Sequence, residues 1–412
     1  MEPTLKEIRI AILGGGMLGT CTALELARRG RRSTLFEGAS TLLQGASRWN
    51  EGKIHLGFLY AGDPTLRTAQ RLIPGGLAFA ALVRRLIERS LDAFSTVEDD
   101  IYLVHRQSIV APEAFEAYGR STATLVREAA SQANALQYLC DVTHAIIRPL
   151  SPSDLAQVTT ADEVIAGYKI PERSISTVAV ADLMQQAAAN EKLIEIRASR
   201  WVIAVKRRLD GRFNVCTNAT SIGREEEPFD LVINALWEGR PAVDASLGIQ
   251  PVAPWSHRFR AAVFAYAPDV SFPSAVLCTG PFGDVKRYAD GRVYLSWYSS
   301  GLLAEGHAIE PPRTSAVLDQ SRSAAVLETT VQSLSHYLPA VRLLNESDRG
   351  LEVHGGWVYA LGQGSLTDPA STLHRRDGFN MTIDRGYISI DTAKYSLAPW
   401  LAHSVAELIV SG

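Results

Sequence analysis

The sequence predicts a mixed α/β fold, α+β in part, with a Rossmann-like unit at the start of the chain and an antiparallel sheet in its middle. Three observations support this prediction. A buried-strand pattern, a glycine loop and a helix pattern follow one another over residues 8–30. The pair Asp290-Gly291 separates two strand-like runs, as in a β-hairpin. The length of 412 residues allows two or three structural units.

The first unit is predicted to be strand, helix and strand. Residues Ile8 to Leu13 are apolar apart from Arg9, which is typical of a parallel strand buried on both faces. Residues Thr20 to Arg29 have helical spacing, and Gly30 follows where a glycine commonly ends a helix. Residues Ser33 to Glu37 then predict the second strand.

The remaining elements follow from the same periodicities. Helical spacing predicts helices, and alternation of apolar and polar residues predicts strands. An acidic loop is expected at residues 225–227. The predicted helices are Thr65 to Leu91, Glu113 to Ala135 and Pro399 to Val410, and the predicted strands are Ile101 to Val110, Trp201 to Val205, Arg212 to Cys216, Leu231 to Ala235, Val285 to Tyr288, Val293 to Tyr298 and Tyr387 to Ile390.

Composition limits the partners and the compartment. The chain carries 41 basic and 44 acidic residues, a balance that gives no electrostatic footprint for nucleic acid or a membrane surface. Its four cysteines lie far apart without a Cys-x-x-Cys pair, so neither a disulfide framework nor a metal site is expected. No apolar run is long enough for a membrane span, and the N-terminus is unlike a signal peptide. We therefore expect a cytoplasmic protein with small-molecule partners.

The glycines Gly14, Gly16 and Gly19 match the pattern G-x-G-x-x-G between a buried strand and a helix, the context in which it binds a dinucleotide. The first permits a tight turn, the second lets the backbone approach a pyrophosphate, and the third lets the helix pack on the strand. Glu37 ends the second strand, where a carboxylate can accept from ribose hydroxyls. This unit alone fits NAD or FAD. The residues expected to hold the ADP half are Gly14, Gly16, Met17, Leu18, Gly19, Glu37 and Gly38.

A polar, glycine-punctuated segment from Gln44 to Gly57 suits a loop that wraps a long polar cofactor. With this segment the sequence resembles the D-amino-acid oxidase, sarcosine oxidase and glycerol-3-phosphate dehydrogenase superfamily of FAD enzymes. Three later stretches are similar to the same superfamily: Val202 to Val205, Val232 to Ala235, and Thr392 to Pro399. Residues 236–238 depart from the glycine-containing continuation that the family has after the second of these.

The resemblance implies FAD as cofactor and an FAD-binding domain interleaved with an antiparallel-sheet substrate domain. The FAD-binding domain would comprise residues 1–90, 175–240 and 345–412, and the substrate domain residues 91–174 and 241–344. The family's cofactor contacts outside the glycine loop carry over to Ser47, Arg48, Asn50, Gly52, Lys53, Val202, Asn234, Ala235, Thr392, Ala393, Lys394 and Tyr395.

The sequence has a single dinucleotide loop. Flavin enzymes reduced by a nicotinamide cofactor usually have a second, and neither residues 355–356 nor 362–364 have the strand and helix for one. The electron donor is then the organic substrate, and oxygen or an acceptor reoxidises the flavin.

The leading prediction for the reaction is hydride removal from a C–N carbon of a small amine or amino-acid derivative. The alternative is oxidation of a 2-hydroxy acid or polyol phosphate, because residues 54–60 are similar to hydroxyglutarate dehydrogenases. A non-catalytic flavin-binding subunit or sensor is the third possibility.

Four residues are candidates for catalysis. The resemblance places Lys394 at a lysine that touches the substrate carboxylate, with a solvated helix-end lysine as the alternative. His55 titrates near neutrality if unperturbed, and is a candidate proton acceptor or a structural histidine. The resemblance adds the possibility of a covalent flavin tether, since some family members attach FAD through a histidine. His354 stands where family members often carry a substrate-binding arginine, and is a second candidate base. Tyr298 is expected on the second hairpin strand, facing a pocket above the flavin or within a plain half-buried sheet.

The arginine missing near His354 leaves the anion contact of the substrate open. Arg375 and Arg287 are candidates, each with a surface salt bridge as the alternative. Tyr288, on the first hairpin strand, is a further candidate substrate contact.

Overall fold

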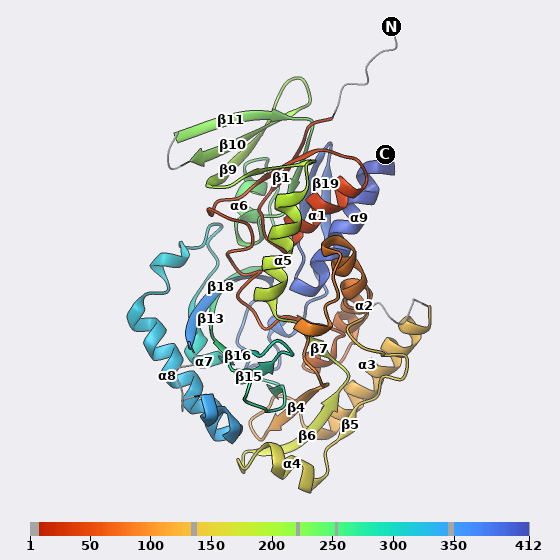
Figure 1. The fold of residues 1–412 in the computed structure, drawn as a ribbon, viewed down its shortest axis with the longest axis vertical. Helices are drawn as coiled ribbons and strands as arrows, with labels where there is room; N and C mark the ends of the chain where they lie inside the picture. The colour runs from red at the N-terminus through yellow and green to blue at the C-terminus, as the bar shows by residue number, and fades with distance from the viewer. Residues whose placement is uncertain (1–7, 133–137, 220–222, 252–253, 345–349, 412) are drawn as a thin grey trace.

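A computed structural model describes residues 8–132, 138–219, 223–251, 254–344 and 350–411. Their main elements are two large sheets, one above the other in Figure 1. The first sheet has six strands in the order β19-β20-β12-β1-β2-β8, all parallel to their neighbours except β19. Its strands are β1 Ile10–Leu13, β2 Ser33–Phe36, β8 Ile194–Arg197, β12 Leu231–Asn234, β19 Met381–Asp384 and β20 Tyr387–Ile390.

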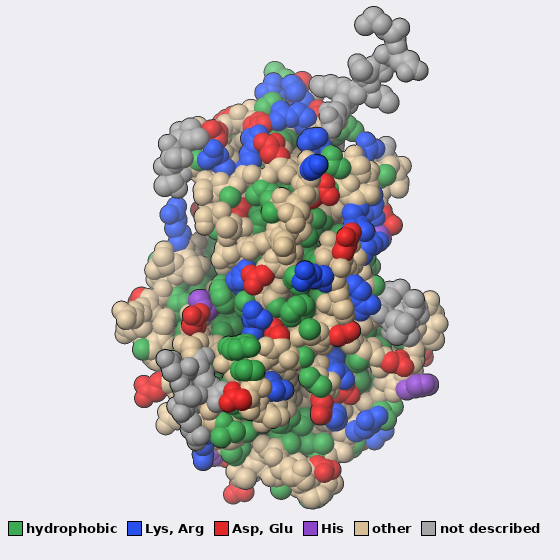
Figure 2. Space-filling view, viewed as in Figure 1, with side chains coloured by type: hydrophobic (Ala, Val, Ile, Leu, Met, Phe, Trp, Pro, Cys, Tyr) green, Lys and Arg blue, Asp and Glu red, His purple; other side chains and the backbone are tan. Residues whose placement is uncertain are grey.

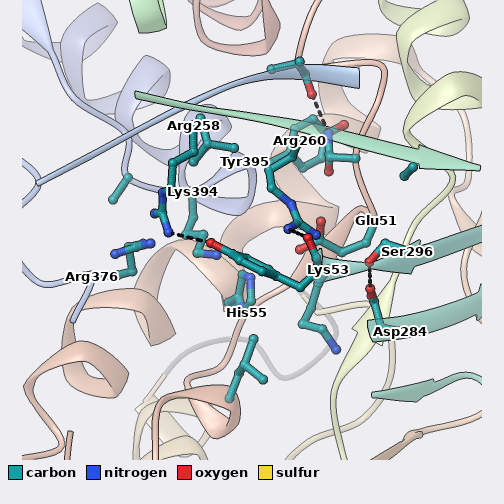
Figure 3. A pocket seen from close by; sticks show the side chains of 18 of the residues that line it. Glu51, Lys53, His55, Arg258, Arg260, Asp284, Ser296, Arg376, Lys394 and Tyr395 are labelled. Carbon is teal, nitrogen blue, oxygen red and sulfur yellow. Dashed lines mark hydrogen bonds between the residues drawn. The ribbon is translucent and has the colours of Figure 1, made fainter. Parts of the chain in front are cut away.

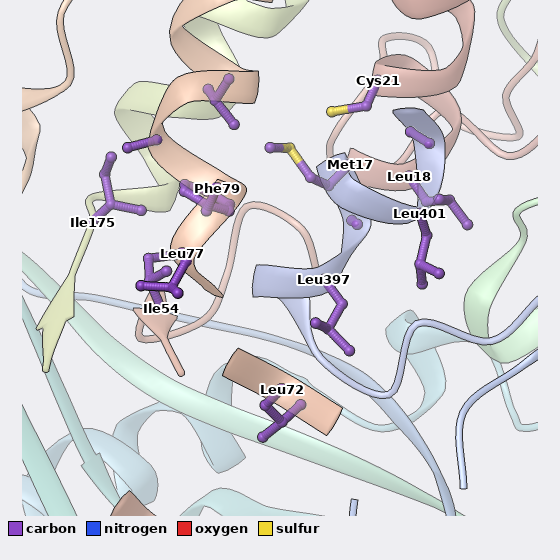
Figure 4. Close-up of a cluster of buried hydrophobic side chains, with 14 of the residues drawn as sticks. Met17, Leu18, Cys21, Ile54, Leu72, Leu77, Phe79, Ile175, Leu397 and Leu401 are labelled. Atoms are coloured by element: carbon purple, nitrogen blue, oxygen red, sulfur yellow. The ribbon is translucent and has the colours of Figure 1, made fainter. Parts of the chain in front are cut away.

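Helices cover one face of the six-stranded sheet. Successive residues of a strand point to opposite faces, and Ile12 of β1 packs in a cluster with helical side chains such as Met17, Phe79 and Leu401 (Figure 4). The predicted helices here are confirmed, and the first begins earlier than predicted because Gly16 is already its N-cap. The helices of this cluster are α1 Met17–Arg28, α2 Arg67–Ile87, α5 Thr177–Asn190 and α9 Ala398–Ser411.

A three-stranded antiparallel sheet covers the opposite face, where Leu13 of β1 packs with Phe213. Its strands are β9 Arg200–Arg207, β10 Phe213–Ala219 and β11 Gly223–Phe229. The prediction of an acidic loop at residues 225–227 is wrong, because these residues lie within β11. Their charge is accommodated in an outer strand by ion pairs such as Arg200–Glu225 at 3.2 Å.

The second large sheet has nine strands in the order β17-β13-β16-β15-β14-β4-β6-β5, with β18 paired to β13. Its neighbours are antiparallel except β14 and β4. Helix α8 Gln320–Tyr337 packs on this sheet through Val331 and Leu334. The strands are β4 Asp100–His105, β5 Arg148–Pro149, β6 Val164–Ile170, β13 Trp255–Tyr266, β14 Ala275–Cys278, β15 Gly283–Arg287, β16 Arg292–Trp297, β17 Leu302–Gly306 and β18 Glu352–Leu361.

The hairpin predicted around Asp290-Gly291 is confirmed as β15 and β16, and Gly291 has the positive φ (+84°) that such a turn requires. Two strand predictions are too long. Tyr298 begins the short helix α7 Tyr298–Gly301 instead of ending β16. The strand predicted to run to residue 110 ends at His105, where the N–H of Ser108 bonds back to its carbonyl and turns the chain.

The predicted division into domains stays a prediction. Strand β18 pairs with β13 in the nine-stranded sheet, whereas the predicted boundaries place residues 345–412 in the other domain. The remaining elements are α3 Pro112–Gln132, α4 Pro152–Val158, α6 Arg240–Ala245 and the two-stranded sheet of β3 Lys53–Ile54 and β7 Arg173–Ser174.

The surface in Figure 2 carries basic and acidic side chains intermingled over the visible face. In the ranges that the structure describes, no helix combines the length and apolar character that crossing a membrane needs.

Candidate active site

A cavity of about 390 Å³ lies where the two large sheets meet. One part of its wall comes from loops that follow β1, β12 and β20, and another from β13, β15, β16 and β18. The carboxyl ends of parallel strands are the usual place for a ligand in an open α/β sheet. The volume lies within the range of about 300–1,000 Å³ that is typical of small-molecule sites.

The glycine loop brings bare backbone to this cavity. Gly14 turns the chain after β1 with a φ of +97°, and Gly16 lines the cavity. The N–H of Met17 donates to the hydroxyl of Ser47 at 2.9 Å, which joins the loop to the segment predicted to pass the flavin. A Cβ at Gly19 would lie 1.8 Å from the carbonyl oxygen of Gly14, so the third glycine lets the helix pack against the strand.

Glu37 holds the glycine loop. Its carboxylate accepts from the N–H of Gly15 at 2.9 Å and from the N–H of Ala39 at 2.7 Å. Burial raises the pKa of this carboxyl, although the backbone hydrogen bonds oppose the shift. Glu37 is not part of the cavity wall, and its contact with a ribose stays a prediction.

The segment after Glu37 supplies Ser47, Asn50, Glu51, Lys53 and His55 to the cavity. The amide of Asn50 donates to the carbonyl of Ala46 at 2.8 Å and accepts from the N–H of Gly52 at 2.8 Å, so this side chain shapes the loop.

Arg48 and Gly52 have structural places beside the cavity. Arg48 is buried and donates to Asp182 at 2.7 Å. Gly52 has a φ of +59°, and a Cβ there would lie 1.8 Å from the carbonyl oxygen of Ile175. Arg48 therefore joins the loop to α5, and Gly52 lets the loop approach the backbone just before that helix.

The closing segment before α9 lines the cavity with four predicted residues, Thr392, Ala393, Lys394 and Tyr395. Lys394 lies 5.6 Å from the ring centre of Tyr60. Burial, and then the charge of Arg376, lower the pKa of Lys394 to about 8, while Glu51 opposes this shift.

Of the remaining predicted cofactor residues, Ala235 lines the cavity, whereas Asn234, Val202 and Gly38 do not. The amide of Asn234 donates to Asp244 and to the hydroxyl of Tyr387, both at 2.9 Å, and so fixes the end of β12. Val202 is buried in β9, and Gly38 packs on the ring of Trp201.

Several further charged side chains line the cavity wall (Figure 3). Arg258 and Arg260 project from the same face of β13. Arg258 donates to the hydroxyl of Tyr298 at 3.2 Å, and Arg260 donates to the carbonyl of Tyr298 at 3.0 Å and lies 3.9 Å from the centre of its ring. Asp284 accepts from Ser296 at 2.5 Å, and burial raises the pKa of this carboxyl.

A buried ionic network lies behind Lys53. Lys53 and Lys286 both donate to the same oxygen of Asp100, the latter at 2.6 Å. Lys53 also lies 3.8 Å from Glu172, which accepts from the hydroxyl of Tyr102 at 2.5 Å. All four charged side chains are at most 3% exposed. The network joins β3, β4 and β15, so it links the loop of the cofactor site to the nine-stranded sheet.

A family model described as "FAD dependent oxidoreductase" matches residues 9–379. The chain belongs to this family of FAD-dependent oxidoreductases. Its resemblance to the D-amino-acid oxidase superfamily is thereby confirmed, and its cofactor is FAD.

Solved structures of this oxidoreductase fold include close matches over almost the whole chain. Glycine oxidase from Geobacillus kaustophilus matches with a TM-score of 0.68 at 16% identity, covering 98% of this chain and 95% of that one. L-alpha-glycerophosphate oxidase from Mycoplasma pneumoniae, solved with FAD bound, matches with 0.65 at 16%, covering 98% and 94%. Iminodiacetate oxidase from Chelativorans sp. BNC1 matches with 0.66 at 15%, covering 98% and 95%. No curated protein sequence matches the chain significantly.

The cavity of this FAD-dependent oxidoreductase has features that fit its cofactor. Gly16 presents bare backbone at the cavity, and a Cβ at this position would lie 3.1 Å from the Ser47 hydroxyl. His55 is buried at the cavity wall with its Nδ1 lacking any hydrogen-bond partner within the described part of the protein. The predicted residues on the wall that would hold FAD are Gly16, Met17, Leu18, Ser47, Asn50, Lys53, Ala235, Thr392, Ala393, Lys394 and Tyr395.

Among the catalytic candidates of this oxidoreductase, His55, Lys394 and Tyr298 line the cavity and His354 does not. The expectation that His55 titrates near neutrality needs correction. Burial, followed by the charges of Lys394 and other cations, lowers its pKa well below the usual value, so His55 is neutral at pH 7. His354 stacks on Trp49, with ring centres 3.7 Å apart, and pairs with Glu352 at 2.9 Å.

The three predicted substrate contacts also lie off the cavity of the oxidoreductase. Arg287 donates to the carbonyls of Val270 and Pro268. The hydroxyl of Tyr288 donates to the carbonyl of Glu51 at 2.9 Å, so this side chain stabilises the segment that follows Glu37. Arg375 is 54% exposed and lies 3.7 Å from Asp63. These placements give the three residues partners within the protein, and their contacts with a substrate stay predictions.

Sequence reasoning missed five charged residues of the cavity: Glu51, Arg258, Arg260, Asp284 and Arg376. One signal was available, since Arg258 and Arg260 stand at positions i and i+2 before the apolar run of residues 261–265, and such residues of a strand share one face. Arg376 had no such signal. Periodicity in an irregular segment does not tell which of two adjacent arginines points inward.

Proposed function

We propose that this FAD-dependent oxidoreductase oxidises a C–N bond of a small amine or amino-acid derivative that also carries an anionic group. The observation that carries the proposal is the distribution of charge in the cavity. Arg258, Arg376 and Lys394 lie together on one side of the view in Figure 3. Glu51 and Asp284 lie on the other side with Arg260 and with Lys53, whose charge is paired with Asp100. A substrate with a cationic nitrogen and an anionic group complements such a wall.

The side chains have separate roles in this proposal. When bound, FAD supplies the acceptor for the hydride that leaves the substrate carbon. The arginines and Lys394 bind the anionic group and orient the substrate, and Glu51 and Asp284 attract the nitrogen. His55 takes a proton from the substrate nitrogen, because it is neutral and its Nδ1 has no partner among the described residues.

C–O oxidation is the second candidate. A neutral histidine serves a hydroxyl as well as an amine, and the fold neighbours include a glycerophosphate oxidase beside the oxidases of glycine and iminodiacetate. The carboxylates on the wall favour the amine, since an alcohol carries no positive charge for them to attract. Because the family is one of oxidoreductases, the possibility of a non-catalytic flavin-binding subunit is set aside.

The test is the visible flavin spectrum of the purified holoprotein under anaerobic conditions. We expect bleaching by amines or amino acids and none by 2-hydroxy acids or polyol phosphates of matched charge. Bleaching by the oxygen compounds alone would replace the proposal with the second candidate. Admitting air, or an artificial acceptor in its place, then identifies the oxidant.

A cytoplasmic setting also stays a proposal, in keeping with four cysteines that are all free.

A further inference from the structure

Three cations converge on one side of the cavity from three separate segments. Arg258 lies on β13, Arg376 follows the turn at residues 372–374, and Lys394 precedes α9. They lie near one another in Figure 3, where Arg258, Arg376 and Lys394 are labelled together. Their charges also oppose one another, since the pKa of Lys394 is lowered by burial and then by Arg376 and Arg258. We call these three residues the cationic side.

Within the described residues, none of the three forms an ion pair with a carboxylate. Arg258 is 4% exposed, its Nε has no hydrogen-bond partner, and its one side-chain bond goes to the neutral hydroxyl of Tyr298. The guanidinium of Arg376 donates to the carbonyls of Leu373 and Arg375. Buried charges are costly unless they are paired, so an arrangement of this kind is typical of a ligand site that lacks its anion.

Lys53 and Lys286 in the same region are neutralised within the protein, whereas Arg260, like the cationic side, has no ion pair with a carboxylate among the described residues. Lys53 and Lys286 share Asp100, with Glu172 beside Lys53. The carboxylate nearest in sequence to Lys394 is Asp391, which accepts from the N–H of Ala393 and faces Arg240 at 3.6 Å. Within the described part of the protein, the cationic side therefore has no carboxylate in direct contact, and the charges of Glu51 and Asp391 act on it only from a distance.

The pyrophosphate of FAD does not account for this charge. The glycine loop offers that group bare backbone and the N-terminus of α1, which together suit a phosphate. A single carboxylate would pair with one guanidinium in a bidentate contact and leave two cations unmatched.

We propose that the cationic side recognises a group of at least two negative charges, either a phosphate or two carboxylates held close together. This inference deepens the proposed function and rests on it, because it places the anionic group of the substrate at Arg258, Arg376 and Lys394. A substrate of a single carboxylate would leave part of the site without a partner.

Isothermal titration calorimetry on the FAD-loaded protein tests the proposal at constant ionic strength. The probes are inorganic phosphate, glutarate and acetate, used separately. We expect phosphate or glutarate to bind at least tenfold more tightly than acetate. The probe that binds more tightly identifies the source of the double charge. Equal binding of acetate, or binding of none of the three, would overturn the proposal.

The adjacent arginines provide a matched pair of variants. Arg376→Gln is expected to weaken binding of the preferred dianion by about 10-fold to 100-fold, as loss of a charge-assisted contact does. Arg375→Gln, at an exposed side chain off the cavity, should change it less than about twofold. Equal losses in the two variants would contradict a local site. If Arg376→Gln fails to retain FAD, Arg258→Gln is tested by the same comparison, with flavin absorbance reporting an intact holoprotein.

These outcomes separate the inference from the proposed function. A protein whose flavin is bleached by amines but which binds acetate as well as glutarate keeps the proposed function and loses the inference. A protein that prefers glutarate, loses this preference on Arg376→Gln and is bleached only by hydroxy compounds keeps the inferred anion site and loses C–N oxidation.

Discussion

The glycine loop and the cationic side of the same cavity are built in different ways. At the glycine loop, backbone groups from one short stretch of chain form the wall, and their positions depend on the absence of side chains. At the cationic side, the wall consists of charged side chains that three distant segments bring together. The first surface suits a part of the ligand that every family member shares, and the second suits the part that distinguishes one substrate from another.

The largest effect should come from filling the glycine loop. Gly16→Val places a branched side chain where a Cβ already meets the Ser47 hydroxyl at 3.1 Å and where the backbone lines the cavity. We expect the purified variant to contain almost no flavin, measured as the ratio of flavin to protein absorbance after reconstitution with FAD. Gly45→Ala is the control, because a Cβ at that position would have open space for 4 Å around it. A Gly16→Val protein with full flavin content would refute a backbone-built cofactor site.

The buried network behind Lys53, where charges are paired within the protein, tests how much side-chain charge contributes to stability next to the unpaired cationic side. Asp100→Asn leaves Lys53 and Lys286 without their shared carboxylate, and breaking a buried ion pair costs about 3–5 kcal/mol. We expect the free energy of unfolding in urea to fall by this amount. Asp99→Asn, which removes a partly exposed partner of Arg173, should cost about 1 kcal/mol or less.

A compensating substitution sharpens the same comparison. In Asp100→Asn, Lys286 loses its ion-pair partner while Lys53 keeps Glu172, so adding Lys286→Met removes the unpaired cation and part of the lost stability should return. A double variant that is less stable than Asp100→Asn alone would show that packing, and not charge, dominates this network.

A smaller effect should appear in the pH dependence of substrate binding. Burial and Arg376 lower the pKa of Lys394 to about 8, so the lysine is charged below that pH and loses its proton as the pH rises through it. For the substrate that bleaches the flavin, kcat/KM should be level near neutrality and fall above about pH 8, by roughly tenfold. In Lys394→Met this alkaline limb should be absent. Its persistence would assign the titration to another group.

The same profile bears on His55. Because the pKa of His55 lies well below its usual value, no loss of activity from its protonation is expected near its ordinary pKa of about 6.5. A limb at that pH would mean that His55 titrates as an ordinary solvated histidine.

Sequence reasoning succeeded where the determinants are local. The order of strand, glycine loop and helix at residues 10–28 follows from adjacent residues, as does the hairpin turn at Gly291. It did not anticipate side-chain directions that depend on a distant partner. His354 faces Trp49, and Arg375 instead of Arg376 faces Asp63. The acidic stretch at residues 225–227 became a strand because basic residues on other strands pair with it.

The parallel pairing of β12 with β20 has a consequence for how the protein is made. β1 pairs with β12 across more than half of the chain, and β20, which leads into the closing segment, emerges from the ribosome after the whole nine-stranded sheet. Until then the edge of β12 lacks its neighbour, and unpaired strand edges promote misassembly. Lys394 can therefore meet the arginines only after the nine-stranded sheet has been synthesised, so the cationic side is among the last parts of the cavity to form.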